Sequence, residues 1–162
     1  MIVDFNLLPD TSRFWIFTAN QKLTQEQINI LNAELSLFMQ KWTAHKVDLN
    51  ASFEIVENAI LIIAVDESHA GASGCSIDAM TKEIKRITDD FEVDFLNRFS
   101  IVLKMEDNVL VSNTNHLKSL IETQQVNAET FVSNAMVASF GELKSNLFLP
   151  IKETWLSRYL VS

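Results

Sequence analysis

The chain has 162 residues with 48% hydrophobic and 21% charged side chains, which fits one folded domain (residues 1–162) and excludes a disordered chain. Its net charge of −8, with lysine and arginine scattered along the sequence, argues against a nucleic-acid partner. The single cysteine excludes an internal disulfide, and no basic leader opens the sequence, so we expect a cytoplasmic protein. No apolar run approaches the roughly 20 residues that cross a bilayer, so we also expect it to be soluble and without membrane association.

A strand and a helix are predicted first along the chain. Residues 13–18 form a short aromatic and β-branched run, which is typical of a buried strand. Thr24 and Gln27 have the spacing of a capping box, in which each side chain bonds the other residue's free backbone N–H. An apolar stripe at spacings of three and four then predicts an amphipathic helix that ends near Thr43. Its members are Ile28, Leu31, Leu35, Phe38 and Trp42.

A hairpin is predicted from residues 51–57 and 59–66. The two extended segments are separated only by the Glu57–Asn58 region, which predicts antiparallel pairing. The first segment alternates apolar and polar residues, whereas the second is apolar throughout. We therefore expect the first strand near a sheet edge and the second in the middle of the sheet.

A second helix and a fourth strand complete the predicted core. Ser76 is the expected N-cap of this helix, with Ser73 as the alternative. The helix carries its own apolar stripe, and residues 99–105 then alternate as a strand. The order through Met105 is βαββαβ, which predicts an α+β, ferredoxin-like sandwich over residues 13–105, with an antiparallel sheet and two helices on one face. The helical stripe consists of Ile77, Met80, Ile84, Ile87 and Phe91.

The C-terminal extension, residues 106–162, has a weaker pattern. A tight turn predicts that residues 109–111 return as a hairpin strand. Short helices are predicted around 117–121, after Ser139 and over 150–160, where Trp155 and Tyr159 share one face. Residues 130–137 fit either a strand or an irregular docked segment.

The predicted topology gathers reactive side chains at one end of the sheet. In a right-handed βαββαβ unit the connections 42–50 and 66–78 leave from the same end. We call these two connections, with Arg13 beside them, the loop end. Two of the three histidines, His45 and His69, would then lie near the only cysteine, Cys75.

Cys75 is a candidate nucleophile. It lies at or just before a predicted helix start, where the unpaired amides and the helix dipole favour a thiolate. His45 or His69 would serve as the base. The alternative is a small buried hydrophobe, since cysteine is among the most buried residue types and its acidic neighbours oppose ionisation.

The glycines of the second connection indicate a candidate anion site. Gly71 to Gly74 would bring backbone N–H groups to an anion at the helix start, with hydroxyls from Ser73 and Ser76. The alternative is a tight turn in which glycine permits a positive φ. No local HxxxH or CxxC pair supports zinc, so we predict neither a metal site nor a cofactor. The candidate ligand-binding residues are Gly71, Ser73, Gly74, Ser76, Trp42 and Arg13.

Three segments carry a resemblance to known sequences. They are WTAH at 42–45, SGCSID at 73–78 and W-x-S-R at 155–158. Together they resemble an uncharacterised family of short bacterial proteins, over most of the chain, whose members are sometimes labelled ABC transporter ATPase. The resemblance supplies no activity or catalytic residues. Because the chain has no GKS or GKT phosphate-binding loop, we do not expect it to be an ABC-type ATPase.

The sequence therefore leaves three functional hypotheses. The first is a non-enzymatic domain that binds a small anionic ligand or a protein partner at the loop end. The second is a small enzyme that uses Cys75 with His45 or His69. The third is a scaffold that forms a homodimer through an exposed sheet edge or face.

Overall fold

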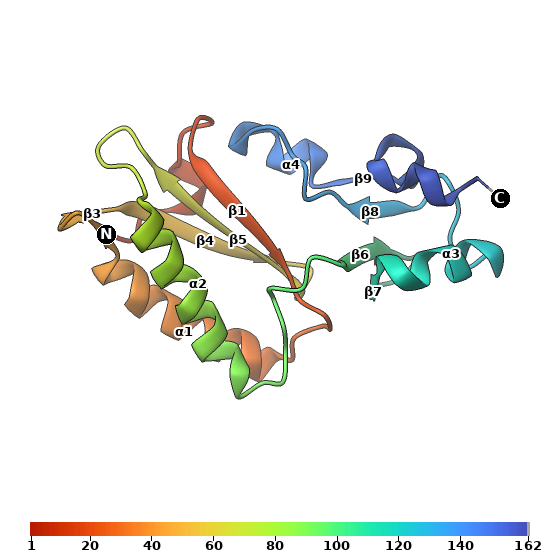
Figure 1. Ribbon diagram of the computed structural model, residues 1–162, viewed down its shortest axis with the longest axis horizontal. Helices are drawn as coiled ribbons and strands as arrows, with labels where there is room; N and C mark the ends of the chain where they lie inside the picture. The colour runs from red at the N-terminus through yellow and green to blue at the C-terminus, as the bar shows by residue number, and fades with distance from the viewer. Residues whose placement is uncertain (162) are drawn as a thin grey trace.

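The computed structural model describes residues 1–161 and shows an α+β fold with two main antiparallel sheets (Figure 1). The helices of this part of the chain are α1 (Gln25–Lys41), α2 (Gly74–Asp89), α3 (Thr114–Glu122) and the short α4 (Leu143–Asn146). None of the helices within residues 1–161 is long and apolar enough to span a membrane. The predicted α+β class is confirmed.

The first sheet contains β1 (Arg13–Thr18), β4 (Asn50–Val56) and β5 (Ile60–Asp66) in the order β1-β5-β4. Helices α1 and α2 lie against one face of this sheet (Figure 1). Strand β5 is central and apolar throughout, so both of its faces are buried. The largest side chains of the core between helices and sheet include Leu31, Leu35, Met39, Leu61, Ile63, Met80 and Ile84.

Both long helices begin with capping boxes. Thr24 and Gln27 cap α1 as predicted. In α2 the N-cap is Ser73 and not Ser76: the Ser76 N–H donates to Ser73 Oγ at 3.2 Å, and the Ser73 N–H donates to Ser76 Oγ at 2.8 Å. Serine at the third helical position performs the role expected of glutamate or glutamine, so the helix starts earlier than predicted.

Two tight hairpin turns have left-handed residues. Glu57 and Asn58, with φ of 52° and 54°, connect β4 to β5, so the weak turn signal there is confirmed. The second hairpin joins β2 (Thr43–Ala44) to β3 (Val47–Asp48) through His45 and Lys46, whose φ values are 52° and 67°. Positive φ at both central residues matches the right-handed strand twist.

The strand predicted at 99–105 belongs to the second sheet and not to the first. It has the order β7-β6-β8-β9, formed by β6 (Ser100–Lys104), β7 (Val109–Asn113), β8 (Phe131–Ser133) and β9 (Phe148–Pro150). The four-stranded ferredoxin-like sheet is therefore not confirmed, although β1, α1, β4, β5 and α2 follow the predicted order. The reason is that both backbone edges of β6 are occupied, by β7 and β8.

Packing also keeps β6 out of the first sheet, although it contacts β1. Val102 belongs to the cluster that covers Ile60 and Ile62 on the helix-free face of the first sheet. Ile101 and Leu103 point into a separate cluster with α3 and the C-terminal turns. Because each face of β6 has its own apolar cover, moving this strand beside β1 would expose one of them.

The C-terminal extension closes the helix-free face of the first sheet. Phe140 at a 3₁₀ turn, with Leu143 and Leu147 around α4, packs against Phe14 and Ile62. Residues 130–137 contain β8, which settles the strand alternative for part of that segment. The tail predicted as one helix instead forms two 3₁₀ turns, Ile151–Glu153 and Trp155–Tyr159.

Candidate functional site

Trp42 has a structural contact at the loop end. Its side chain is buried, and Nε1–H donates to the backbone oxygen of Ser76 at 2.9 Å. The ring also packs against Trp15 and Phe38. This tryptophan therefore ties the end of α1 to the first turn of α2, and its only side-chain donor is already used.

Glu67 fills the predicted anion cradle from within the chain. Its Oε2 accepts the Ala72 N–H at 3.1 Å, while its Oε1 lies 3.9 Å from Nη1 of Arg13. Arg13 also donates to the Ala72 oxygen at 3.5 Å. The carboxylate thus occupies the position between a cation and a backbone amide that an external anion would take.

The two loop glycines are explained by space and by the helix start. Neither has a positive φ, so the predicted left-handed turn is wrong. A Cβ at Gly71 would lie 2.5 Å from Glu67 Oε2, so a larger residue there would require the end of the Glu67 side chain to move. Gly74 is the first residue of α2 and has open space around it.

The candidate catalytic residues share the loop end without bonding to one another. Cys75 is exposed in the first turn of α2, His45 is exposed in the β2–β3 turn, and His69 is exposed after β5. Within residues 1–161 no hydrogen bond joins either histidine to the thiol, and no three His, Cys, Asp or Glu side chains are grouped to hold a metal ion. A catalytic role for this trio stays a prediction.

Asp66 organises the turn that carries His69. Its Oδ1 accepts the Ser68 N–H at 2.9 Å, and this backbone bond, helped by the Ser68 hydroxyl and by His69, lowers the pKa of the Asp66 carboxyl. Asp66 is thus the second carboxylate, after Glu67, that accepts a hydrogen bond from a backbone N–H of the same loop.

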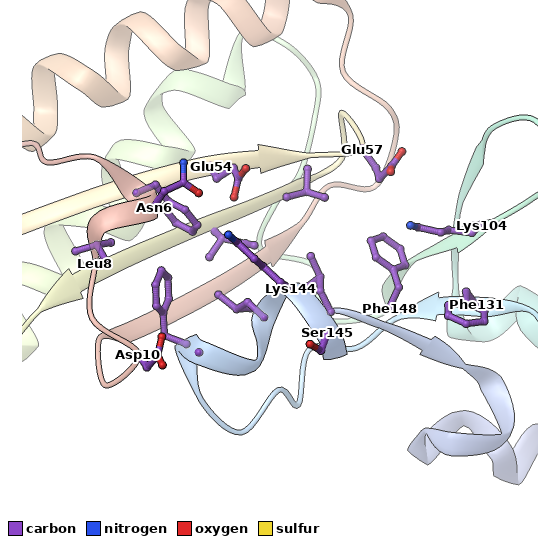
Figure 2. Close-up of a pocket in the computed structure, with 17 residues that line it drawn as sticks. Asn6, Leu8, Asp10, Glu54, Glu57, Lys104, Phe131, Lys144, Ser145 and Phe148 are labelled. Atoms are coloured by element: carbon purple, nitrogen blue, oxygen red, sulfur yellow. The ribbon is translucent and has the colours of Figure 1, made fainter.

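A cleft that the sequence did not indicate lies on the opposite side of the sheet. It has a volume of about 540 Å³ and separates the helix-free face of the first sheet from the C-terminal extension (Figure 2). Its walls come from the N-terminal turn, from β4 and β5, and from residues 140–148. The apolar lining comprises Phe5, Leu8, Val56, Ile62, Phe131, Phe140, Leu143, Leu147 and Phe148.

Charged side chains stand around this apolar lining (Figure 2). Asp10 lies at the Gly141 end of the lining. Of the other four charged residues, Glu54 and Glu57 come from β4 and the turn after it, Lys104 comes from the end of β6, and Lys144 comes from α4. Among the described residues none of these four forms an ion pair or a side-chain hydrogen bond. The Lys104 ammonium instead lies 4.4 Å from the centre of the Phe148 ring.

A backbone crossing fixes one end of the cleft. The Gly141 N–H donates to the Asp10 oxygen at 3.2 Å, joining the extension to the N-terminal segment. A Cβ at Gly141 would lie 2.8 Å from the Asp10 Cβ, so the two segments approach closely only because residue 141 is glycine.

One feature of the sequence could have indicated a second apolar layer over the first sheet, though not the cleft itself. Residues 59–65 are apolar on both faces, whereas α1 and α2 cover only one face. A strand of this kind requires a second apolar layer. The C-terminal third of the chain and the N-terminal turn supply that layer.

No family model matches the chain, and neither a curated protein nor a solved structure matches it. The resemblance to short bacterial proteins therefore stays a prediction.

Proposed function

We propose that this chain is a non-enzymatic binding domain, and that its ligand is a small molecule with an apolar body and an anionic group that lies in the cleft. The observation that supports this is the presence of two lysines, Lys104 and Lys144, without ion-pair partners beside an aromatic and aliphatic lining.

The cleft has the size and lining of a small-molecule site. Ligand pockets typically measure about 300–1,000 Å³ and combine an apolar lining with a few polar groups. Each 40 Å² of apolar surface that a ligand buries contributes about 1 kcal/mol. An apolar body on Phe148 and Leu147 would supply most of the affinity.

The charges would orient the ligand. Figure 2 shows Lys144 reaching from the extension toward the β4 side and Lys104 at the Phe148 end of the cleft. Because Asp10, Glu54 and Glu57 are also in the lining, an anionic group is favoured only where it lies next to one of the two ammonium groups and away from these carboxylates. A ligand that carried its charge on the β4 side would face two carboxylates.

The loop end fits the same ligand less well. Its Arg13 guanidinium and its Ala72 amide already contact Glu67, and Trp42 is buried. An anion at Gly71, Ser73, Gly74 and Ser76 would compete with Glu67 for the Ala72 N–H and with the capping box for the Ser73 and Ser76 groups. The loop end therefore remains the alternative position for the ligand.

Fluorescence titration with 8-anilinonaphthalene-1-sulfonate tests the proposal, because this probe has an aromatic body and one sulfonate. We expect saturable binding to the folded protein, and about fivefold weaker binding to Lys144→Ala, since an exposed ion pair is worth up to about 1 kcal/mol. The matched control is Lys22→Ala, which removes an exposed lysine outside the cleft.

Two outcomes would count against the cleft. One is an equal loss of affinity in both lysine variants. The other is binding that disappears in Glu67→Ala or Arg13→Ala and is unaffected in Lys144→Ala, which would move the ligand to the loop end. Circular dichroism of each variant checks that the fold is unchanged.

A further inference from the structure

Strand β1 is an unpaired edge of the first sheet. Within residues 1–161 it forms backbone hydrogen bonds only with β5, and Ala19, the residue after it, donates its N–H to the Ala59 oxygen at 2.7 Å. Residues that are directly opposite in an antiparallel pair alternate between bonded and unbonded positions. Arg13, Trp15 and Phe17 therefore bond to β5, and the residues between them point their backbone groups outwards.

The other side of the sheet gives the same assignment. Ala51 of β4 bonds outwards to Met1 and Val3, so the even-numbered residues of β4 and β5 bond to each other. The odd-numbered residues of β5 therefore form its backbone hydrogen bonds to β1, which agrees with the bond between Ala19 and Ala59. Within residues 1–161, the outward backbone groups of Phe14, Ile16 and Thr18 have no hydrogen-bond partner.

Nothing in β1 protects this edge from pairing. Residues 14–18 contain no charge and no proline, their register with β5 is unbroken, and all five side chains are only partly buried. Edge strands are normally blunted by such devices. The β4 edge has two protecting features that β1 lacks: the N-terminal residues cover it at Ala51, and Glu54 places a charge on it.

We propose that β1 pairs antiparallel with β1 of a second copy of this chain, around a twofold axis at Ile16. Phe14 of each copy then lies opposite Thr18 of the other, and Trp15 lies opposite Phe17. Every cross-strand pair is aromatic or β-branched, the types that stabilise sheets most. The outward groups of Phe14, Ile16 and Thr18 all gain partners.

The charge at the end of β1 favours a second copy in this orientation. Arg13 is the only charged residue of the strand. In the antiparallel pair the two arginines lie about 20 Å apart, six residues along the strand, whereas parallel pairing would place them side by side. Strand β6 begins beyond the end of β1 and runs away from it, so it does not take the vacant position (Figure 1).

Residue-resolved amide hydrogen exchange at micromolar and millimolar protein concentration, together with sedimentation, tests this pairing in the unmodified chain. We expect a dimer at high concentration, and exchange at Phe14, Ile16 and Thr18 slowed by at least about tenfold. The outward amides of Phe53 and Ile55 on β4 are the internal control and should not change with concentration.

A monomer at millimolar concentration would overturn the proposal, as would a dimer in which the three β1 amides still exchange fast. Thr18→Lys provides a second test, because lysine on an edge strand opposes pairing. We expect it to weaken the dimer about tenfold, whereas Thr43→Lys, at an exposed position of β2, should not. Equal dimerisation of the two variants would contradict the pairing. No β1 residue lines the cleft, so these results leave the proposed ligand site untouched.

Discussion

The loop end and the cleft both place charged side chains beside apolar packing, but they use those charges differently. At the loop end Glu67 bonds the Ala72 amide beside Arg13, and Asp66 bonds the Ser68 amide. In the cleft the charged side chains of Glu54 and Lys144 have no ion-pair partner within residues 1–161.

The difference teaches how to separate a structural cluster from a binding site. A polar group that is already bonded gains little from a ligand, because the ligand only replaces one bond with another. An exposed charge without an ion-pair partner exchanges bonds to water for the ligand's group and gives up no protein partner, and the apolar surface beside it can be buried at the same time. This distinction predicts different responses of the two regions to substitution.

Trp42→Ala is expected to lower the free energy of unfolding by about 3–5 kcal/mol, because a buried ring and its bond to the Ser76 oxygen are both lost. Urea denaturation measures this change. Trp155→Ala is the matched control: that ring is 47% exposed, so its loss should cost much less. Equal effects would show that Trp42 does not hold the loop end together.

Ser73→Ala should cost about 1 kcal/mol of stability, because α2 loses the N-cap side chain that accepts the Ser76 N–H. Ser145→Ala, an exposed serine in the wall of the cleft, should leave the denaturation midpoint unchanged. If both substitutions were neutral, the capping box would not contribute to folding.

Glu67→Ala should create an anion site at the loop end. The substitution frees the Ala72 N–H and Arg13, so we expect sulfate to shift the amide resonances of residues 71–75 in the variant and not in the unmodified protein. Stability should change by less than about 1 kcal/mol, because the ion pair is exposed. Equal sulfate shifts in both proteins would contradict the view that Glu67 fills the cradle.

Asp66→Asn should remove a small acid-dependent part of the stability. The Ser68 N–H lowers the pKa of Asp66 in the folded state, so its contribution is complete above the unfolded-state pKa and is lost as the pH falls through the lowered value. Denaturation at a series of pH values should show the difference between the two proteins shrinking only in acid. A difference that stays constant into strong acid would assign the effect to another interaction.

His45→Ala and His69→Ala are expected to leave the alkylation rate of Cys75 unchanged, because no hydrogen bond joins these side chains. The rate with iodoacetamide near neutral pH measures this. A fall of about tenfold in either variant would restore the cysteine-dependent enzyme as the better hypothesis.

Local features of the fold were predictable from short stretches of sequence. The Thr24–Gln27 capping box and the apolar stripes of α1 and α2 depend on residues within a few turns of one helix. The turn at Glu57–Asn58 was predicted from the two flanking strands, although its residues are weak turn formers. In these cases the local preference and the tertiary packing agree.

The path of β6 was not predictable in the same way. Its alternation is equally consistent with a place beside β1 and with a place in a second sheet. The choice depends on β7 and β8, and β8 lies about 30 residues further along the chain. Such long-range pairing leaves no local trace in the strand itself.

The cleft was missed for a related reason. Glu54, Lys104 and Lys144 are separated by some 40 to 50 residues, and they face one another only because the extension folds back over the first sheet. At the loop end, Trp42 contacts Ser76 and Arg13 contacts Ala72, whereas the grouping of the two histidines with Cys75 stays a prediction. The chemistry of the loop end was not predictable, because nothing in the sequence shows that Glu67 turns inwards to bond the Ala72 amide.

The contact of Gly141 with Asp10 has a consequence for how this protein can diverge. Adding a single methyl group at residue 141 forces the extension and the N-terminal segment apart, since that Cβ would lie 2.8 Å from the Asp10 side chain. Such a change would widen one end of the cleft without altering any charge in it. Among related chains, the residue at this position is therefore expected to vary with the size of the molecule that each one accommodates.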